Sequence, residues 1–188
     1  MDIIFVRHGE SHDNVEKRFS RDFITLTERG IQQIREARDN LAAYDFTRVY
    51  VSPLKRTLQT LSHLGLDGVV DDRVREMNFG VFTGLTFNEY QDKYPQETRL
   101  WMEDSFNYTI PEGESIADTY KRVESFMEDM LQKNENALVV THEGIIRLAC
   151  SWVIGGADHF YRFRADNGSA TVISADRNYR FIKQLNHK

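Results

Sequence analysis

The chain begins with MDIIFVRHGE (residues 1–10), in which four apolar residues run directly into an arginine, a histidine and a glycine. A short, continuous apolar run such as Ile3–Val6 predicts a strand that is buried on both faces, as strands of parallel sheets are. The stretch ALVVTHEGII (residues 137–146) has the same design, with a histidine between an apolar run and a helical pattern. Strands that alternate with helices predict an α/β fold with a mainly parallel sheet.

Three further segments fit this alternation of strands and helices. LTERGIQQIREARDNL (residues 26–41) predicts an amphipathic helix with Thr27 as its N-cap. Val49–Val51 predicts a strand, followed by Ser52 as an N-cap and Pro53 at the first helical position. The last segment, ATVISADRNYRFIKQL (residues 170–185), has the pattern of a β-hairpin.

The overall composition indicates a single soluble domain. Of 188 residues, 40% are hydrophobic and 28% are charged, and the longest apolar run is too short for a membrane span. The N-terminus lacks the basic region of a signal peptide, so a cytoplasmic location is expected. The single cysteine, Cys150, excludes an internal disulfide and cysteine-rich metal sites, and the net charge of −5 argues against non-specific nucleic-acid binding.

Polar residues follow three of the predicted strands, at Arg7-His8, Ser52–Arg56 and Thr141-His142. The carboxyl ends of parallel strands share one edge of a sheet, and ligands bind there. Guanidinium groups and the first turn of a helix both favour anions, and glycines such as Gly9 and Gly144 allow a close backbone approach to a ligand. The sequence therefore predicts a pocket for a tetrahedral anion.

This set of residues suits phosphoryl transfer. His8 could attack phosphorus through one ring nitrogen, while Arg7, Arg56 and His142 stabilise charge on the phosphoryl oxygens. A carboxylic acid is also needed to protonate the leaving oxygen. Glu10 and Glu143 both lie beside a histidine, and spacing alone does not choose between them. The scheme needs neither a metal nor a cofactor, and the sequence offers no good cluster of metal ligands.

Six ordered segments resemble the phosphoglycerate mutase-like branch of the histidine phosphatase superfamily. They extend over about residues 3–175 and read RHGES..N (Arg7 to Asn14), LTERGIQQ, SPLKRTLQT, REMNFGVFTG, PEGES and VVTHEGIIRLA. The resemblance implies a three-layer α/β/α sandwich whose mostly parallel sheet has an antiparallel edge. It also implies one domain over residues 1–188, with a cap or insert at about residues 79–114.

The resemblance also assigns roles to residues. It implies that His8 becomes a phosphohistidine and that Glu76, in REMNFG, is the proton donor and later the base. It places Arg7, Arg56 and His142 around the phosphate, with a side-chain bond from Asn14. His142 would also stabilise the transition state.

The chain departs from the family pattern at several positions. Ser20 and Arg21 stand where such phosphatases commonly carry glutamine and glycine, and Phe82-Thr83 replaces a frequent Trp-Glu pair. Glu143 stands where a glycine is frequent, although its backbone N–H could still donate to phosphate. Ser20 and the backbone N–H of Glu143 are accordingly included among the candidate phosphate-binding groups.

The resemblance favours a metal-independent phosphatase of a small or medium phosphomonoester, because the related mutases are longer and enclose their sites. Eight aromatic residues between Phe79 and Tyr108 could shape a leaving-group pocket or simply pack the cap onto the core. Three alternatives remain: phosphoglycerate mutase-type transfer, a protein phosphohistidine or phosphotyrosine phosphatase, and a low-turnover phospho-ligand-binding module. The expected partner is a small molecule, with no nucleic acid and no membrane, and both a monomer and a homodimer are compatible with the sequence.

Overall fold

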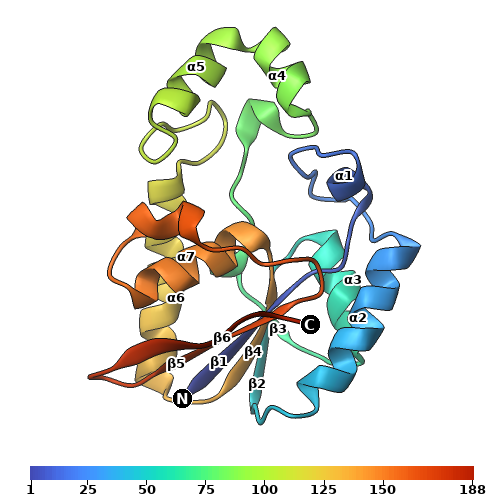
Figure 1. Cartoon of the computed structure of the whole chain (residues 1–188), viewed down its shortest axis with the longest axis vertical. Helices are drawn as coiled ribbons and strands as arrows, with labels where there is room; N and C mark the ends of the chain where they lie inside the picture. The colour runs from blue at the N-terminus through green and yellow to red at the C-terminus, as the bar shows by residue number, and fades with distance from the viewer.

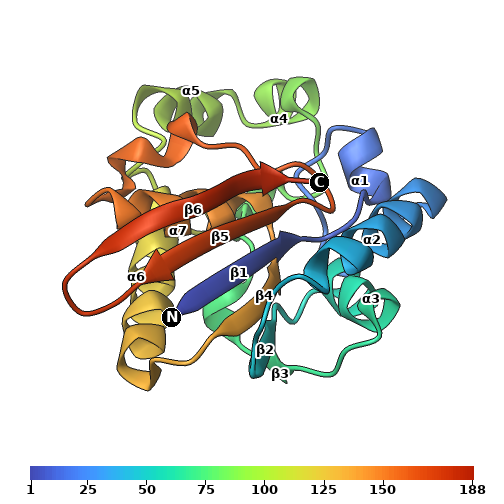
Figure 2. The ribbon, with the colours of Figure 1, turned by 60° about the horizontal axis from the view of Figure 1, so that its bottom comes forward.

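The computed structural model describes residues 1–188 and contains one six-stranded sheet, with the strand order β3-β2-β4-β1-β5-β6 (Figures 1 and 2). The first four strands along the chain pair in parallel, whereas β5 runs antiparallel to β1 and β6 antiparallel to β5. The predicted mostly parallel sheet with an antiparallel edge is confirmed. The strands are β1 (Asp2–Arg7), β2 (Arg48–Val51), β3 (Val69–Val70), β4 (Ala137–Thr141), β5 (Ala170–Ala175) and β6 (Arg180–His187).

Helices cover both faces of this sheet and complete three layers. Helices α2 and α3 lie on one face, and α6 and α7 lie on the other (Figure 2). The α-helices are α1 (His12–Val15), α2 (Glu28–Leu41), α3 (Lys55–Leu64), α4 (Phe87–Lys93), α5 (Pro95–Glu103), α6 (Ile116–Lys133) and α7 (Glu143–Val153), with short 3₁₀ turns at Asp72–Val74, Gly80–Phe82 and Ala157–Arg162. None of the helices combines the length and apolar character that crossing a membrane requires.

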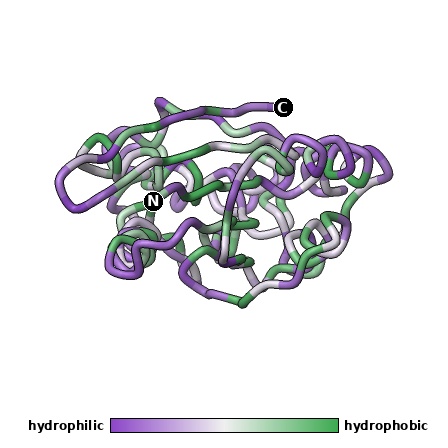
Figure 3. The backbone as a smooth tube through the Cα atoms, turned by 90° about the horizontal axis from the view of Figure 1, so that it is seen from below, coloured by the Kyte–Doolittle hydropathy of each residue, from purple (hydrophilic) through white to green (hydrophobic).

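The molecule has two hydrophobic cores, one on each face of the sheet, and the apolar run Ile3–Val6 contributes side chains to both. Side chains of a strand alternate between the two faces of a sheet, and the Ile3–Val6 side chains are fully buried. Ile4 and Val6 pack in the core under α2 and α3, while Ile3 and Phe5 pack in the core under α6 and α7. Figure 3 shows the hydrophobic segments gathered in the middle of the molecule.

The start of α3 differs from the sequence prediction. The helix begins at Lys55 with Leu54 as its N-cap, so Ser52 is not the cap and Pro53 is not the first helical residue. The hydroxyl of Ser52 instead lies 2.7 Å from a ring nitrogen of His142 on the neighbouring strand end. This tertiary contact, together with the Thr57 hydroxyl that donates to the Ser52 and Leu54 carbonyls, holds residues 52–54 in a non-helical turn.

Helices α4 and α5 stand apart from the three layers, beyond the carboxyl ends of the parallel strands (Figure 1). Thr86 and Glu89 form the predicted capping box of α4, and Pro95 begins α5. The ends of this segment are in backbone contact at Gly80 and Gly113. A Cβ on Gly80 would overlap the Pro111 carbonyl, and a Cβ on Gly113 would overlap the Asn78 carbonyl, so this close approach requires glycine at both positions. The site described next lies below this segment.

Candidate active site

His8 lies at the carboxyl end of β1 with its imidazole buried. Its Nδ1 lies 2.7 Å from the carbonyl oxygen of Gly9, which can only accept, so the geometry places the ring proton on Nδ1. Burial, followed by the charges of Arg56 and Arg7, holds the pKa of His8 well below its usual 6.5. The ring is therefore neutral, with a lone pair on Nε2.

Arg56 faces that lone pair from the first turn of α3. Its Nε donates to His8 Nε2 at 3.2 Å, and its Nη1 donates to the Arg21 carbonyl at 3.0 Å. The guanidinium is almost completely buried, which lowers the pKa of Arg56 to about 10, yet it has no carboxylate within salt-bridge distance. A buried guanidinium without a paired anion is suited to receive a bound anion.

Arg7, the last residue of β1, is held by one nitrogen only. Its Nη1 donates to the Ala165 carbonyl at 2.6 Å and lies 2.9 Å from Glu143 Oε2. Its Nε is buried and has no partner in the chain. The Nε–Nη2 edge of the guanidinium is thus free for a bidentate contact with phosphate.

His142 follows β4 and faces His8, with their ring centroids 5.1 Å apart. Ser52 Oγ accepts from the Leu54 amide at 3.4 Å and lies 2.7 Å from His142 Nε2, its one other hydrogen-bond partner, so the hydroxyl donates to Nε2. The proton of the neutral imidazole must then be on Nδ1, which is buried and unpartnered. Burial, Arg56 and His8 keep the pKa of His142 well below 6.5, so Nδ1–H is a neutral hydrogen-bond donor.

Glu76 is the carboxyl group that the structure presents to this site. The Met77 amide donates to its Oε1 at 3.0 Å and the Gly144 amide approaches Oε2 at 3.4 Å. Burial raises the pKa of Glu76 above its usual 4.5, although Arg56 and the Met77 amide act in the opposite direction. A Cβ on Gly144 would overlap Glu76 Oε1. The absence of a side chain at Gly144 thus makes room for the Glu76 carboxyl, whereas the sequence predicted a close approach of this glycine to a ligand.

The two carboxylates that sequence spacing left open are engaged elsewhere. Glu10 accepts a hydrogen bond from the Thr27 hydroxyl at 2.9 Å, at the start of α2. Glu143 forms ion pairs with Arg7 and Arg147. The backbone N–H of Glu143 opens α7, where first-turn amides have no partner within the helix.

Asn14 enters the site through a contact that sequence reasoning missed. Its Oδ1 accepts from the backbone amide of Ser11 at 3.0 Å and from Asn167 Nδ2 at 3.2 Å. The same Asn167 nitrogen donates to the His8 carbonyl at 3.1 Å. With Oδ1 occupied, the amide group of Asn14 remains available to an anion. No sequence motif singled out Asn167, whose loop is far from the N-terminal signature along the chain.

The last predicted phosphate-binding position is Ser20. Ser20 is partly exposed, and its hydroxyl forms no hydrogen bond within the chain. Its neighbour Arg21 pairs with the fully buried carboxylate of Asp13, and its carbonyl holds Arg56. The loop therefore supports the site through Arg21, and a contact between Ser20 and phosphate stays a prediction.

Gly9 has a structural role that differs from the predicted close approach to a ligand. A Cβ on Gly9 would overlap the carbonyl of Gly30, and a Cβ on Gly30 would overlap the carbonyl of Glu10. The loop after β1 and the first turn of α2 are thus in backbone contact. This contact requires glycine on both sides, and it fixes the direction in which the chain leaves His8.

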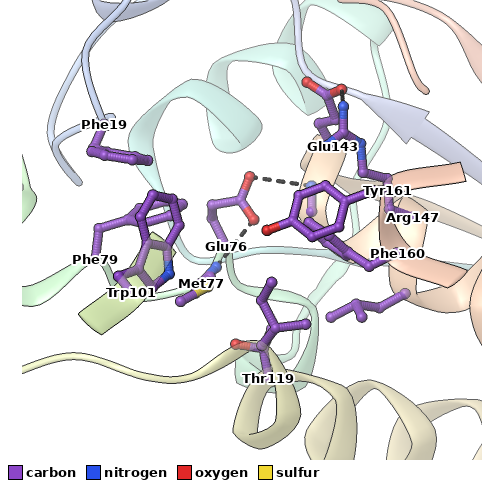
Figure 4. Close-up of a pocket in the computed structure, with 13 residues that line it drawn as sticks. Phe19, Glu76, Met77, Phe79, Trp101, Thr119, Glu143, Arg147, Phe160 and Tyr161 are labelled. Atoms are coloured by element: carbon purple, nitrogen blue, oxygen red, sulfur yellow. Dashed lines mark hydrogen bonds and ion pairs between the residues drawn. The ribbon is translucent and has the colours of Figure 1, made fainter. Parts of the chain in front are cut away.

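A pocket of about 270 Å³ opens beside Glu76 (Figure 4). Phe19, Phe79 and Trp101 form one wall, and Phe160 and Tyr161 stand on the opposite side with Arg147 (Figure 4). The remaining lining residues are Met77, Ile116, Thr119, Glu143, Gly144 and Leu148. The pocket is therefore mostly apolar and aromatic, with the Glu76 carboxyl between it and the phosphate-side residues.

Only two of the eight aromatic residues predicted between Phe79 and Tyr108 line this pocket, namely Phe79 and Trp101. Phe82 and Tyr90 are buried and stack on each other, with ring centroids 4.6 Å apart. Most of these aromatics therefore pack the cap onto the core. Phe19, Phe160 and Tyr161 come from other segments, and sequence reasoning missed them. Arg147 could have been found, because it lies one helical turn after Glu143.

The chain is similar to known proteins in both sequence and fold. Residues 3–188 match the family model of the histidine phosphatase superfamily (branch 1). Phosphoserine phosphatase 1 of Hydrogenobacter thermophilus is 31% identical over 98% of this chain and 91% of its own length. Fructose-2,6-bisphosphatase of Saccharomyces cerevisiae is 33% identical over 75% of this chain, which matches 31% of that longer protein. The crystal structure of the α-ribazole phosphatase from Shigella flexneri superposes with a TM-score of 0.90 at 28% identity, covering 99% of this chain and 96% of that one.

Proposed function

The chain belongs to the histidine phosphatase superfamily, and from this membership we propose how its residues hydrolyse a phosphomonoester. The protein is a phosphoric monoester hydrolase that acts through a phosphohistidine. The observation that carries the residue assignment is the fixed tautomer of His8. Its Nδ1–H donates to the Gly9 carbonyl oxygen, and its Nε2 lone pair faces the guanidinium of Arg56, which forms no ion pair with a carboxylate.

In the first step, His8 Nε2 attacks phosphorus while the bond from phosphorus to the ester oxygen breaks. Protonated Glu76 gives its proton to the departing oxygen, which leaves as an alcohol or phenol. The raised pKa of Glu76 favours this protonated form. Arg7, Arg56 and the Nδ1–H of His142 donate to the phosphoryl oxygens, where negative charge is concentrated.

In the second step, a water molecule attacks the phosphohistidine and the phosphorus–nitrogen bond breaks. The Glu76 carboxylate left by the first step accepts the proton of that water, which restores the acid. Inorganic phosphate departs and His8 regains its lone pair. Asn14 and the backbone N–H of Glu143 complete the set of phosphate donors, and neither Ser20 nor a metal ion has a part in this scheme.

The proposed substrate is a small or medium phosphomonoester whose leaving group has an apolar or aromatic part. The pocket beside Glu76 supports this choice, because its walls are mostly aromatic and its volume of about 270 Å³ exceeds the roughly 150 Å³ that holds one benzene ring. Residues 79–114 would act as the cap of a single domain over residues 1–188, since α5 supplies Trp101 to the pocket.

The test is a phosphate-release assay over a panel of phosphomonoesters with His8→Ala as the blank, in the presence of a chelator. The panel contains aryl phosphates, sugar phosphates, α-ribazole 5′-phosphate and phosphoserine, the last two after the names of the relatives. We expect His8-dependent release from aryl phosphates, inhibition by vanadate, and a phosphoenzyme that is stable in alkali and labile in acid.

Other outcomes identify the alternatives. Isomerisation of phosphoglycerate with negligible hydrolysis indicates a mutase, and dephosphorylation of phosphohistidine or phosphotyrosine proteins alone indicates a protein phosphatase. Vanadate binding without turnover indicates a phospho-ligand-binding module. Equal phosphate release by wild type and His8→Ala overturns the proposal.

A further inference from the structure

Asp13, in the short helix α1, is a fully buried carboxylate whose hydrogen bonds all go to Arg21. The Arg21 amide donates to Oδ2 at 2.8 Å, Nε of the same residue donates to Oδ2 at 3.2 Å, and Nη2 pairs with Oδ1. One carboxylate thus holds both the backbone and the side chain of Arg21. The hydrolysis scheme above gives this ion pair no part.

The carbonyl oxygen of Arg21 connects the ion pair to the phosphate side of the site. It accepts from Nη1 of Arg56 at 3.0 Å. The only other bond of the Arg56 guanidinium within the chain runs from its Nε to Nε2 of His8, at 3.2 Å. The position of the guanidinium therefore depends on two acceptors, and one of them is the reacting nitrogen itself.

Phosphoryl transfer removes one of these two acceptors. The lone pair of His8 Nε2 forms the bond to phosphorus, so it no longer accepts from Arg56. The Arg21 carbonyl is then the one protein acceptor that still fixes the guanidinium, while its other nitrogens donate to the phosphoryl oxygens. A misplacement of about 1 Å can cost roughly 10²-fold in rate, so the placement of this carbonyl matters most in the transition state.

The Arg21 carbonyl lies in a loop between the cap and α3. On one side the Phe19 carbonyl accepts from an amide of the cap at 2.7 Å, and on the other the Asp22 carbonyl accepts from the Lys55 amide at 3.1 Å. Between these two points, Asp13 supplies every acceptor that the N–H groups of Arg21 have within the chain. Because the Asp13 carboxylate is fully buried, it has little freedom to move and is a rigid anchor for the loop.

We infer that Asp13 and Arg21 are positioning residues, whose ion pair holds the Arg21 carbonyl where it keeps Arg56 aligned with the phosphoryl oxygens during attack by His8. The inference rests on the proposed function, since it concerns the same hydrolysis. It gives a role to Arg21, which stands where glycine is common in the family. Neither member of the pair touches the substrate, so both act through Arg56.

Two variants remove the ion pair with little change of shape, namely Asp13→Asn and Arg21→Gln. For each we expect kcat on aryl phosphates to fall about 10- to 100-fold while KM changes less than about threefold, because the loss falls mainly on the transition state. Arg21→Lys keeps a cation beside Asp13 and should retain more activity than Arg21→Gln. Glu16→Gln is the matched control, since it removes an exposed ion pair with Arg18 in the same part of the chain and should keep wild-type activity.

Inhibition separates positioning from a general loss of structure. Vanadate bound to His8 Nε2 imitates the five-coordinate phosphorus of the transition state, whereas inorganic phosphate leaves the lone pair of Nε2 free to accept from Arg56. In Asp13→Asn, the Ki of vanadate should rise about as much as kcat falls, and the Ki of phosphate should rise less than about threefold. Arg21→Gln, which changes a half-exposed side chain, gives the same comparison without altering a buried residue. Variants that lose kcat but keep both inhibition constants are only partly unfolded, and that result overturns the inference.

A double-mutant cycle shows whether the ion pair acts through Arg56. Arg56→Met removes the guanidinium that reaches the Arg21 carbonyl, so adding Asp13→Asn to it should lower kcat/KM less than about twofold further. An additive loss in the double variant, or an equal loss in Glu16→Gln, overturns the inference and leaves the hydrolase assignment intact. A wild-type protein that releases no His8-dependent phosphate contradicts the proposed function itself.

Discussion

The Ser52 hydroxyl lies 2.7 Å from Nε2 of His142, and this bond decides which ring nitrogen faces the phosphate pocket. Ser52 is buried between β2 and α3, and His142 is buried between β4 and α7. Because the hydroxyl has no other acceptor, it fixes the proton of His142 on Nδ1. Ser52 is thus a positioning residue that acts through His142.

Replacing Ser52 with alanine should lower kcat/KM about 3- to 10-fold, the usual worth of one hydrogen bond. The loss has a specific signature, because His142 can then populate the tautomer that has no proton on Nδ1. We expect weaker inhibition by vanadate in parallel with the loss of activity. Ser62→Ala, which changes an exposed serine on α3, is the control. Activity lost only through unfolding, with vanadate affinity unchanged in the folded fraction, would contradict the positioning role.

Gly144→Ala should lower the activity of the protein without lowering its stability. The added methyl group overlaps Glu76 Oε1 and displaces the carboxyl, while alanine favours the helix in which Gly144 lies. For alkyl phosphates, kcat/KM should fall about 10²-fold or more, as expected for loss of general acid catalysis. The loss should be much smaller for p-nitrophenyl phosphate, whose leaving group needs no proton.

The control for this variant is Gly156→Ala, because a Cβ at Gly156 meets no neighbouring atom. Thermal unfolding of both variants measures stability. An equal loss of activity on alkyl and p-nitrophenyl phosphates would show that Gly144 matters for something other than the placement of Glu76.

The dependence of kcat/KM on pH should be bell-shaped, with its maximum in mildly acidic solution. Attack requires neutral His8, whose pKa is held well below 6.5, so activity falls only when the pH drops below that lowered pKa. Protonation of the leaving group requires Glu76 as the acid, and its pKa lies above 4.5, so activity falls again as the pH rises through that pKa. Alkyl phosphate hydrolysis measured from pH 3 to 9 tests both limbs, and Glu76→Gln should remove the alkaline limb.

Gly30→Ala should destabilise the fold without touching the substrate. Its Cβ would overlap the Glu10 carbonyl and push the loop after β1 away from α2, at a cost of about 1–3 kcal/mol in the free energy of unfolding. Urea denaturation measures this change. Arg38→Ala, at an exposed position on the same helix, should have little effect. A Gly30→Ala protein of wild-type stability would show that the contact relaxes easily.

Much of the fold could be predicted because its signals are local. The buried strand at Ile3–Val6, the N-cap at Thr27 and the capping box at Thr86 each depend on residues close together in the sequence, and all three appear in the structure. The start of α3 could not be predicted in this way. Its N-cap candidate, Ser52, bonds to a histidine 90 positions away.

The sequence by itself determined that two arginines and two histidines meet at one edge of a parallel sheet, since strand direction and the order of strands and helices require it. Spacing along the chain did not choose the carboxyl group, and the family resemblance pointed to Glu76; only the tertiary structure shows which groups hold each of the three carboxyl side chains. Glu10 lies two residues after His8 and Glu143 directly follows His142, but Glu10 accepts a hydrogen bond from the Thr27 hydroxyl and Glu143 bridges two arginines. Glu76 reaches the site through a bond to an amide 68 positions away, and such long-range packing follows from how the layers close over the sheet rather than from spacing along the chain.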